Sequence, residues 1–372
     1  MTKYPRIRVL ELSGSHYDMG YQHGITYAEA IHHFAEERVK LSGDEAWSGR
    51  NMDRADVLAL AEKCLDEHRH YSPKLVQELQ GMADATKLSM AELLIVNGFT
   101  DFIDTVYALS LKPDGGDTVK TPAHAGADNC TVFTVPDHKA RDNKGFYGQT
   151  WDMHDTATPH VILIHGKPSH APEFFTFTTV GCVGMIGMNS EGIAVGINNL
   201  TGADGQIGVM WPLVVRKVLE QDNMDDALEC ITKAKLAGAH NYMLFDKHGR
   251  GYNIEAMSST YHITELKDEA LVHTNHCTVA QTRTVERKRD PVAQASSEAR
   301  LNQGQRLLAK NDIVIEDLQA LTRDPEAICV TGKPPRFVET CGAAIMRPAT
   351  LEFWMCWGLP SENEYEHFKL TS

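Results

Sequence analysis

The chain has 372 residues, with 36 Lys and Arg against 50 Asp and Glu, so its net charge is −14 with His neutral. This acidic balance argues against nucleic acid or an anionic membrane as the main partner. No apolar run approaches the ~18 residues of a membrane span, and residues 1–8 lack the apolar stretch of a signal peptide. We therefore expect an ordinary soluble globular protein.

Eight Cys are spread along the sequence without a Cys-x-x-Cys pair, which favours buried, reduced thiols in a cytoplasmic protein. The chain has 18 His, but residues 32–33 and 68–70 are expected on solvated helix faces. The sequence contains no His-Glu-x-x-His zinc motif, and the serine-hydrolase, P-loop and dinucleotide-binding motifs are also missing. We expect neither a metal nor a cofactor.

Apolar residues recur at helical spacing in the first part of the chain and predict helices over 27–39, 55–68 and 74–85. Ser89 with Glu92 three residues later predicts a capping box at the start of a fourth helix. Residues 112–129 are rich in Gly, Pro, Asp and Thr without any period, which predicts a loop or linker.

After the linker the pattern changes to short β-rich runs bounded by turn residues, at 130–135, 145–153, 160–166, 173–181, 192–200, 242–246 and 251–257. Helical patterns return at 212–221, 224–235, 298–310 and 315–322, and strands at 342–346 and 351–357. Because strands and helices do not alternate regularly, we predict an α+β fold with antiparallel hairpins.

Cys130 follows the linker directly and opens the first β-rich run, a position that suits a nucleophile better than core packing. Asp152 interrupts an apolar strand, although alone it is most simply a turn or edge-strand residue. Asn198, Asn199 and Asn275 are each, taken singly, most simply turn residues.

Together these residues resemble a family. Cys-Thr after a loop, Gly-Gln-x-Trp-Asp at 148–152, Gly-Met-Asn leading to Asn-Asn at 198–199, and His-Thr-Asn-His at 273–276 occur in the order of the N-terminal-nucleophile cysteine hydrolases. Residues 11–24, with Gly14, Gly20 and Gly24, also resemble the opening of one branch. That branch is the acyl-coenzyme A:6-aminopenicillanic acid acyltransferase-like family.

The resemblance implies that the chain cuts itself between Asn129 and Cys130, and that Cys130 then uses its own α-amine as the base. It implies that Asp152 orients this amine and that Asn275, aided by Asn198 or Asn199, forms the oxyanion hole. Gln149 would fix the nucleophile strand and contribute to substrate binding. Trp151 and Trp211 are candidates for the substrate pocket, although core packing explains aromatic residues equally simply.

Two positions depart from the family pattern. Asn129 stands where Gly is common before the nucleophile, and Val330 stands where the family often has an Arg. We expect Arg336 to supply that cation from a neighbouring turn, with Arg347 as the alternative.

The resemblance also implies a four-layer αββα sandwich with two antiparallel sheets. We expect a single domain over 1–372, divided by cleavage into 1–129 and 130–372, which stay docked. The implied activity is hydrolysis of a linear amide bond in a small N-acyl or amino-acid amide, with the uncut chain as a zymogen. Two alternatives remain open: an acyltransferase with a thioester donor, and an uncleaved relative that only binds a ligand. The sequence leaves a homo-oligomer open.

Overall fold

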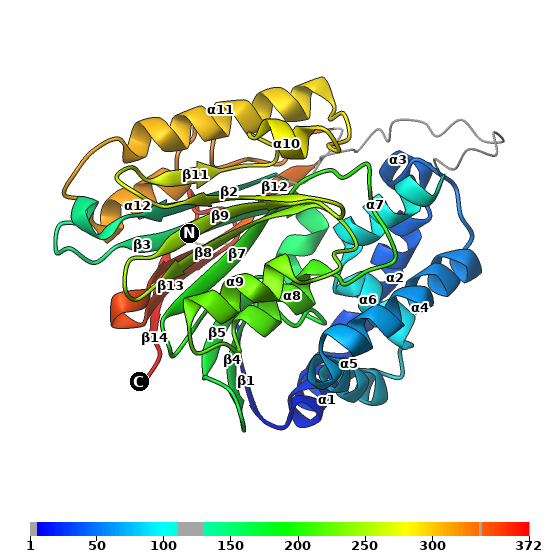
Figure 1. The fold of residues 1–372 in the computed structure, drawn as a ribbon. Coiled ribbons are helices and arrows are strands. Elements are labelled where there is room, and N and C mark those ends of the chain that lie inside the picture. The colour runs from blue at the N-terminus through cyan, green and yellow to red at the C-terminus, as the bar shows by residue number, and fades with distance from the viewer. Residues whose placement is uncertain (1–5, 111–128, 335–336, 372) are drawn as a thin grey trace.

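The computed structural model describes residues 6–110, 129–334 and 337–371. Two β-sheets pack face to face, helices cover both outer faces, and the N-terminal helices gather at one end (Figure 1). Helix α11 contacts strand β2 of one sheet, β2 contacts β7 of the other, and β7 contacts α8. This layer order is the expected αββα arrangement, and the α+β class is confirmed.

The eight-stranded sheet has the order β1 (Val9–Gly14), β4 (Val161–Pro168), β5 (Phe174–Thr179), β6 (Ile186–Asn189), β7 (Ile193–Asn199), β8 (His240–Asp246), β9 (Gly251–Ala256), β10 (Tyr261–Glu265). The six-stranded sheet has the order β11 (Leu271–His273), β2 (Asn129–Val135), β3 (Phe146–His154), β12 (Val338–Arg347), β13 (Glu352–Trp357), β14 (Tyr365–Lys369). The expectation of two antiparallel sheets is wrong at one edge, because β1 runs parallel to β4. The N-terminal helices lie between these two strands in the chain and make such a crossover feasible.

The described helices are α1 (His16–Thr26), α2 (Ala28–Ser42), α3 (Glu45–Ser48), α4 (Arg54–Tyr71), α5 (Pro73–Thr86), α6 (Met90–Val96), α7 (Phe99–Ser110), α8 (Trp211–Val218), α9 (Met224–Thr232), α10 (Ala280–Arg283), α11 (Pro291–Leu308) and α12 (Ile315–Thr322). Within the described ranges, none is both long and apolar enough to cross a bilayer. The predicted helices are confirmed, including the capping box of Ser89 and Glu92 at α6.

Two local expectations are wrong, and a third falls almost entirely outside the described residues. Helix α11 begins at Pro291 rather than at residue 298, because Asp290 accepts the backbone N–H groups of Val292 and Ala293. His68 is buried rather than solvated, and its Nε2 accepts the backbone N–H of Met210 (3.0 Å). The predicted linker 112–129 lies outside the described residues except for its last residue, which begins β2.

The glycines near the N-terminus allow α1 and α5 to pack with their backbones in contact. A Cβ atom at Gly20 would lie 1.8 Å from the carbonyl oxygen of Glu78, and one at Gly81 would lie 2.1 Å from that of Tyr17. Real Cβ atoms do not approach so closely. The spacing of Gly20 and Gly24 therefore has a packing reason in this chain.

We expect Gly20→Ala to lower the free energy of unfolding by about 3 kcal/mol, because the two helix backbones must separate to admit a methyl group. Denaturant unfolding followed by circular dichroism would measure the change. Gly184→Ala is the matched control, since its Cβ would meet only ordinary contacts at 3.6 Å. Equal stability of the two variants would show that α1 and α5 are free to move apart.

Candidate active site

Cys130 is the second residue of β2 and lies opposite Trp151 of β3. Side chains alternate along a strand, so Cys130 shares a face with Val132 and Thr134. The Thr134 hydroxyl donates to Met243 Sδ of β8 (3.7 Å), which shows that this face is turned toward the eight-stranded sheet. The Cys130 thiol is therefore held between the two sheets, where the residue is only 1% exposed.

The backbone nitrogen of Cys130 has its own partner. It donates to Oδ1 of Asn275, which follows β11, over 2.7 Å. The Asn275 Nδ2 group donates to the backbone carbonyl of Asn199 (3.0 Å), and its backbone N–H donates to Ser297 Oγ (2.9 Å). Asn275 thus ties the start of the nucleophile strand to the end of β7 in the facing sheet.

Arg300 on α11 is a site residue that the sequence reasoning missed. Its side chain is fully buried, and it donates to the carbonyl oxygen of Cys130, to Asn129 Oδ1 (3.1 Å) and to Asn275 Oδ1 (3.0 Å). One signal was available. Arg300 lies at helical spacing from the small buried residues Ser297 and Gly304, so a charge occupies the inner face of α11.

Of the two arginines expected from sequence, only Arg347 lies within the described residues. Arg336 lies outside the described residues. Arg347 is the last residue of β12, and its Nη2 donates to Asp142 (2.9 Å). Asp152 of β3 pairs with Thr340, which lies near the start of β12, whereas Arg347 ends β12. Arg347 is therefore remote from Asp152. Within residues 6–110, 129–334 and 337–371, Arg300 is a cation that the fold brings to Cys130.

Asp152 lies on β3 directly opposite Asn129, one residue before Cys130 on the neighbouring strand. It is fully buried, and no carboxylate hydrogen bond of normal geometry connects it to the described part of the chain. Burial raises the pKa of Asp152 to about 7, while the charge of Arg300 and the hydroxyls of Thr340 and Thr150 act in the opposite direction. A carboxyl group with this pKa can take up and release a proton near neutral pH.

The two asparagines at the end of β7, Asn198 and Asn199, make different contacts. Asn199 presents its carbonyl to Asn275. Asn198 shares a face of β7 with Gly196, which abuts Gln149 of the six-stranded sheet. Its Oδ1 accepts from Asn241 Nδ2 (3.4 Å). Its own Nδ2 is buried and has no hydrogen-bond partner within residues 6–110, 129–334 and 337–371. A buried amide donor of this kind suits the stabilisation of an oxyanion.

Gln149 connects the two sheets. Its Nε2 donates to the backbone carbonyl of Ile197 on β7, and its Oε1 accepts from the Tyr147 hydroxyl (2.9 Å). Gly196 is required beside it, because a Cβ there would lie 2.2 Å from Gln149 Oε1. Gln149 thus links β3, the neighbour of the nucleophile strand, to β7 of the facing sheet. It is not among the residues that line the cavity described next.

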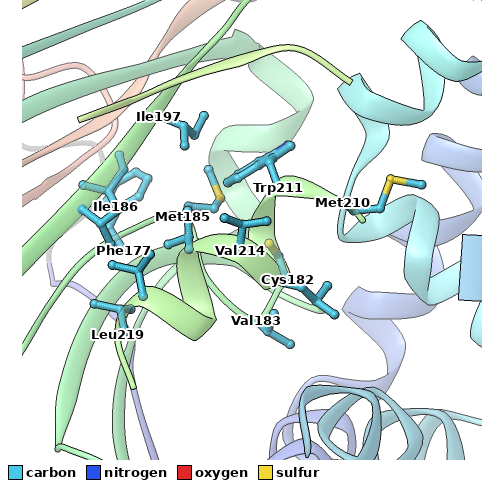
Figure 2. Close-up of a cluster of buried hydrophobic side chains, with 14 of the residues drawn as sticks. Phe177, Cys182, Val183, Met185, Ile186, Ile197, Met210, Trp211, Val214 and Leu219 are labelled. Atoms are coloured by element: carbon cyan, nitrogen blue, oxygen red, sulfur yellow. The ribbon is translucent and has the colours of Figure 1, made fainter. Parts of the chain in front are cut away.

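A cavity of about 40 Å³ adjoins Trp151, the residue paired with Cys130, and Trp211 also lines it. Figure 2 shows Trp211 with Met185 and Cys182, two further wall residues, in the packed cluster beside it. The other half of the wall comes from residues before Asn129: Phe34, Arg38, Val96, Gly98, Phe99 and Thr100. The cavity is therefore built by both parts of the chain.

Residues 139–362 match the family described as acyl-coenzyme A:6-aminopenicillanic acid acyl-transferase. The match includes Asp152, Asn275 and Arg300 and begins after Cys130.

Two curated relatives are similar in sequence. The acyl-coenzyme A:6-aminopenicillanic-acid-acyltransferase 40 kDa form of Emericella nidulans is 26% identical over 211 residues, which are 55% of this chain and 52% of that protein. An uncharacterized protein of Archaeoglobus fulgidus is 24% identical over 262 residues, which are 65% of this chain and 42% of that protein. The chain thus spans about half the length of these relatives.

Two solved structures are distantly similar. A mutant conjugated bile acid hydrolase from Clostridium perfringens aligns with a TM-score of 0.45 and 9% identity, covering 65% of this chain and 97% of that one. Penicillin V acylase from Agrobacterium tumefaciens aligns with a TM-score of 0.38 and 9% identity, covering 65% and 86%. The match over residues 139–362 decides the assignment: this chain belongs to the acyl-coenzyme A:6-aminopenicillanic acid acyl-transferase family.

Proposed function

We propose that the chain is an N-terminal-nucleophile amidase that hydrolyses a small N-acyl or amino-acid amide through an S-acyl intermediate on Cys130. The observation that carries this proposal is the partner of the Cys130 nitrogen, Asn275 Oδ1 at 2.7 Å. An ordinary strand residue needs no buried side chain of another element to hold its backbone nitrogen. Here the atom that would become the catalytic amine has such a partner.

The first step is release of that amine. Cys130 Sγ attacks the carbonyl carbon of Asn129, the C–N bond breaks, and the nitrogen gains a proton while Asn129 becomes a thioester. Water then hydrolyses the thioester to a carboxylate at Asn129 and restores the thiol. We assign the proton exchange to Asp152, because it lies opposite Asn129 and burial raises its pKa to about 7.

Turnover follows the same pattern on an external amide. The free α-amine, with an ordinary pKa of ~7.7–8.0, accepts the thiol proton as Sγ attacks the substrate carbonyl. Asn275 Oδ1 orients the amine, while Asn198 Nδ2 donates to the oxyanion. For Asn275 to serve the oxyanion as well, its Nδ2 must give up the Asn199 carbonyl. The amine product leaves, and water releases the acid from Cys130.

The N-terminal part stays docked in this proposal, because the cavity beside Trp151 needs walls from both 1–129 and 130–372. Those two segments would therefore act as one enzyme after cleavage, with the uncut chain as its zymogen.

The test is the intact mass of the purified protein under denaturing conditions. In proportion to length, the 41.3 kDa chain should give fragments of about 14 kDa and about 27 kDa, the larger beginning at Cys130. A single 41.3 kDa species that hydrolyses no amide would instead support an uncleaved relative that only binds a ligand.

Acyl transfer is the second candidate function, because both the matched family and the Emericella nidulans relative are named as acyltransferases. The two reactions differ only in the acceptor that removes the acyl group from Cys130. Supplying an acyl thioester with an amine, and weighing the products by mass spectrometry, separates them: an amide product shows transfer, and a free acid shows hydrolysis.

A further inference from the structure

The wall of the cavity beside the nucleophile strand contains a hydroxyl group. Thr100, the second residue of α7, and Trp211, the first residue of α8, both line the cavity. The Trp211 Nε1–H group donates to Thr100 Oγ1 over 3.2 Å. Because both residues belong to the wall, this hydrogen bond lies along it, within reach of a ligand that enters.

Two further polar residues support this hydroxyl from behind the wall. Thr100 Oγ1 lies 3.1 Å from Nε2 of His240, the first residue of β8. The other ring nitrogen of His240, Nδ1, lies 2.9 Å from Oδ1 of Asp101. Asp101 Oδ2 accepts the backbone N–H of Trp211 (2.6 Å), as a carboxylate does. Asp101 and His240 are each 1% exposed, so Asp101, His240 and Thr100 form a buried polar chain that ends at the cavity.

The contacts of this chain determine the direction of each proton. Two lone pairs would repel each other at 2.9 Å, so the proton of the neutral His240 ring lies on Nδ1, toward Asp101. Nε2 is then an acceptor, and the Thr100 hydroxyl donates to it. The Trp211 indole can only donate, so Thr100 accepts from it. A hydroxyl has one proton and two lone pairs, so Thr100 can offer a ligand only one remaining lone pair.

The size of the cavity limits which group can use that lone pair. A volume of about 40 Å³ corresponds to roughly three water positions, which admits a small terminal group. A longer apolar body needs Met153 or Met185 to change rotamer, which their flexible side chains allow. A ligand that covers Thr100 without donating to it leaves a buried acceptor unpaired. The cavity should therefore distinguish groups of equal size by whether they carry a proton to donate.

We propose that Thr100 is a specificity-determining residue whose Oγ1 accepts a hydrogen bond from the substrate. The half of the substrate that enters the cavity then carries a hydrogen-bond donor, of which a hydroxyl group is the smallest neutral example. The proposal rests on the proposed function, because it assumes that the cavity beside Cys130 receives the substrate. Thr100 precedes the Asn129–Cys130 bond and His240 follows it, so both parts of the chain build this acceptor.

The experiment compares pentan-1-ol with butyl methyl ether, two isomers that differ in whether the oxygen carries a proton. Each is titrated into protein that is isotope-labelled at the tryptophan indole nitrogens, and the Trp211 indole signal is followed by NMR. Trp211→Phe identifies this signal. The measured quantity is the ratio of the two affinities, alcohol over ether, in the unsubstituted protein and in each variant.

Thr100→Val keeps the shape of the side chain and removes its oxygen. We expect the alcohol-to-ether ratio to fall about tenfold in this variant, because the alcohol loses its acceptor and the ether loses nothing. Comparing variants cancels the different hydration of the two probes. Thr100→Ser should keep the ratio, since the hydroxyl remains. If Thr100→Val does not fold, Thr100→Ala removes the same oxygen without filling the wall.

Thr86→Val is the matched control. Thr86 is a buried threonine of α5 whose hydroxyl donates to the Met82 carbonyl, and it is not among the residues that line the cavity. The ratio should be unchanged in this variant. A fall as large as that in Thr100→Val would show that loss of any buried hydroxyl has the same effect, and the proposal would be wrong.

An unchanged or increased ratio in Thr100→Val would overturn the proposal, as would the failure of both probes to shift the Trp211 signal. An increased ratio would show that Thr100 donates to its ligand. These readings need no turnover. A protein that is cleaved and hydrolyses amides but keeps its ratio in Thr100→Val contradicts only the role of Thr100. A protein that is never cleaved but loses the ratio in that variant contradicts only the proposed function.

Discussion

Replacing Cys130 with Ala is expected to give a single uncut chain of 41.3 kDa that has no amidase activity. Both steps use the same sulfur atom, so one substitution removes both. We expect turnover to fall by a factor on the order of 10⁶, the scale seen when the nucleophile of a hydrolase is removed. Intact mass reports the first step, and release of acid from an amide panel reports the second.

The fold should tolerate this change, because the side chain becomes smaller by one atom at a site that keeps its backbone hydrogen bonds. Cys64→Ala provides the matched control, since Cys64 is equally buried on α4 and far along the chain from the site. It should be cleaved and active. If Cys130→Ala is still cut at the Asn129–Cys130 bond, another group performs the cleavage and the assignment of the nucleophile is wrong.

Replacing Asp152 with Asn is expected to make the protein more stable at pH 8 and to stop its processing. Burial raises the pKa of Asp152 from 3.8 to about 7 in the folded state. Between these values the folded chain binds more protons than the unfolded chain, so stability falls as pH rises from about 4 to about 7 and then stays level. Three pH units correspond to ~4 kcal/mol as an upper bound.

The variant has no such titration, so its stability advantage should be full at pH 8 and vanish near pH 4. Denaturant unfolding with both proteins in the Cys130→Ala background keeps the chains uncut and comparable. Processing, measured with Cys130 intact, should fail because the amide of Asn cannot exchange the proton.

Asp104→Asn is the control for the carboxyl group itself. Burial also raises the pKa of Asp104 to about 7. Unlike Asp152, Asp104 lies beside Arg287 and accepts a hydrogen bond from the backbone N–H of Gly202. This change should alter stability without affecting cleavage. Normal cleavage in Asp152→Asn would remove Asp152 from the proton pathway, and a variant no more stable at pH 8 would show that its pKa is not raised.

Much of the candidate site could be predicted before the fold was known, for a local reason. Cys130 is the second residue of β2, and Asp152 interrupts an apolar strand, so their positions are visible in short stretches of sequence. The pairing of Cys130 with Trp151, and of Asn129 with Asp152, follows from hairpin geometry over about twenty residues. The capping box at Ser89 is equally local, since it lies within the four residues 89–92.

Other parts of the site depended on contacts between segments far apart in the chain. Arg300 is on a helix 170 residues after Cys130, and only the packing of α11 on β2 brings its guanidinium to the Cys130 carbonyl. An amphipathic helix pattern says which residues are buried but not what they meet. The sequence therefore favoured Arg336, with Arg347 as the alternative, over Arg300. The burial of His68 depends on the same kind of contact, here with Met210.

The sequence by itself determined the α+β class, most of the helices and strands, and the family to which the chain belongs, since these depend on local propensity and on motifs in a fixed order. The tertiary structure alone decided which arginine reaches Cys130, that β1 runs parallel to β4, and that Arg38 and Trp151 share a cavity. The physical reason is that a buried charge, a strand partner and a cavity wall are each defined by two segments together. Local sequence describes only one of them.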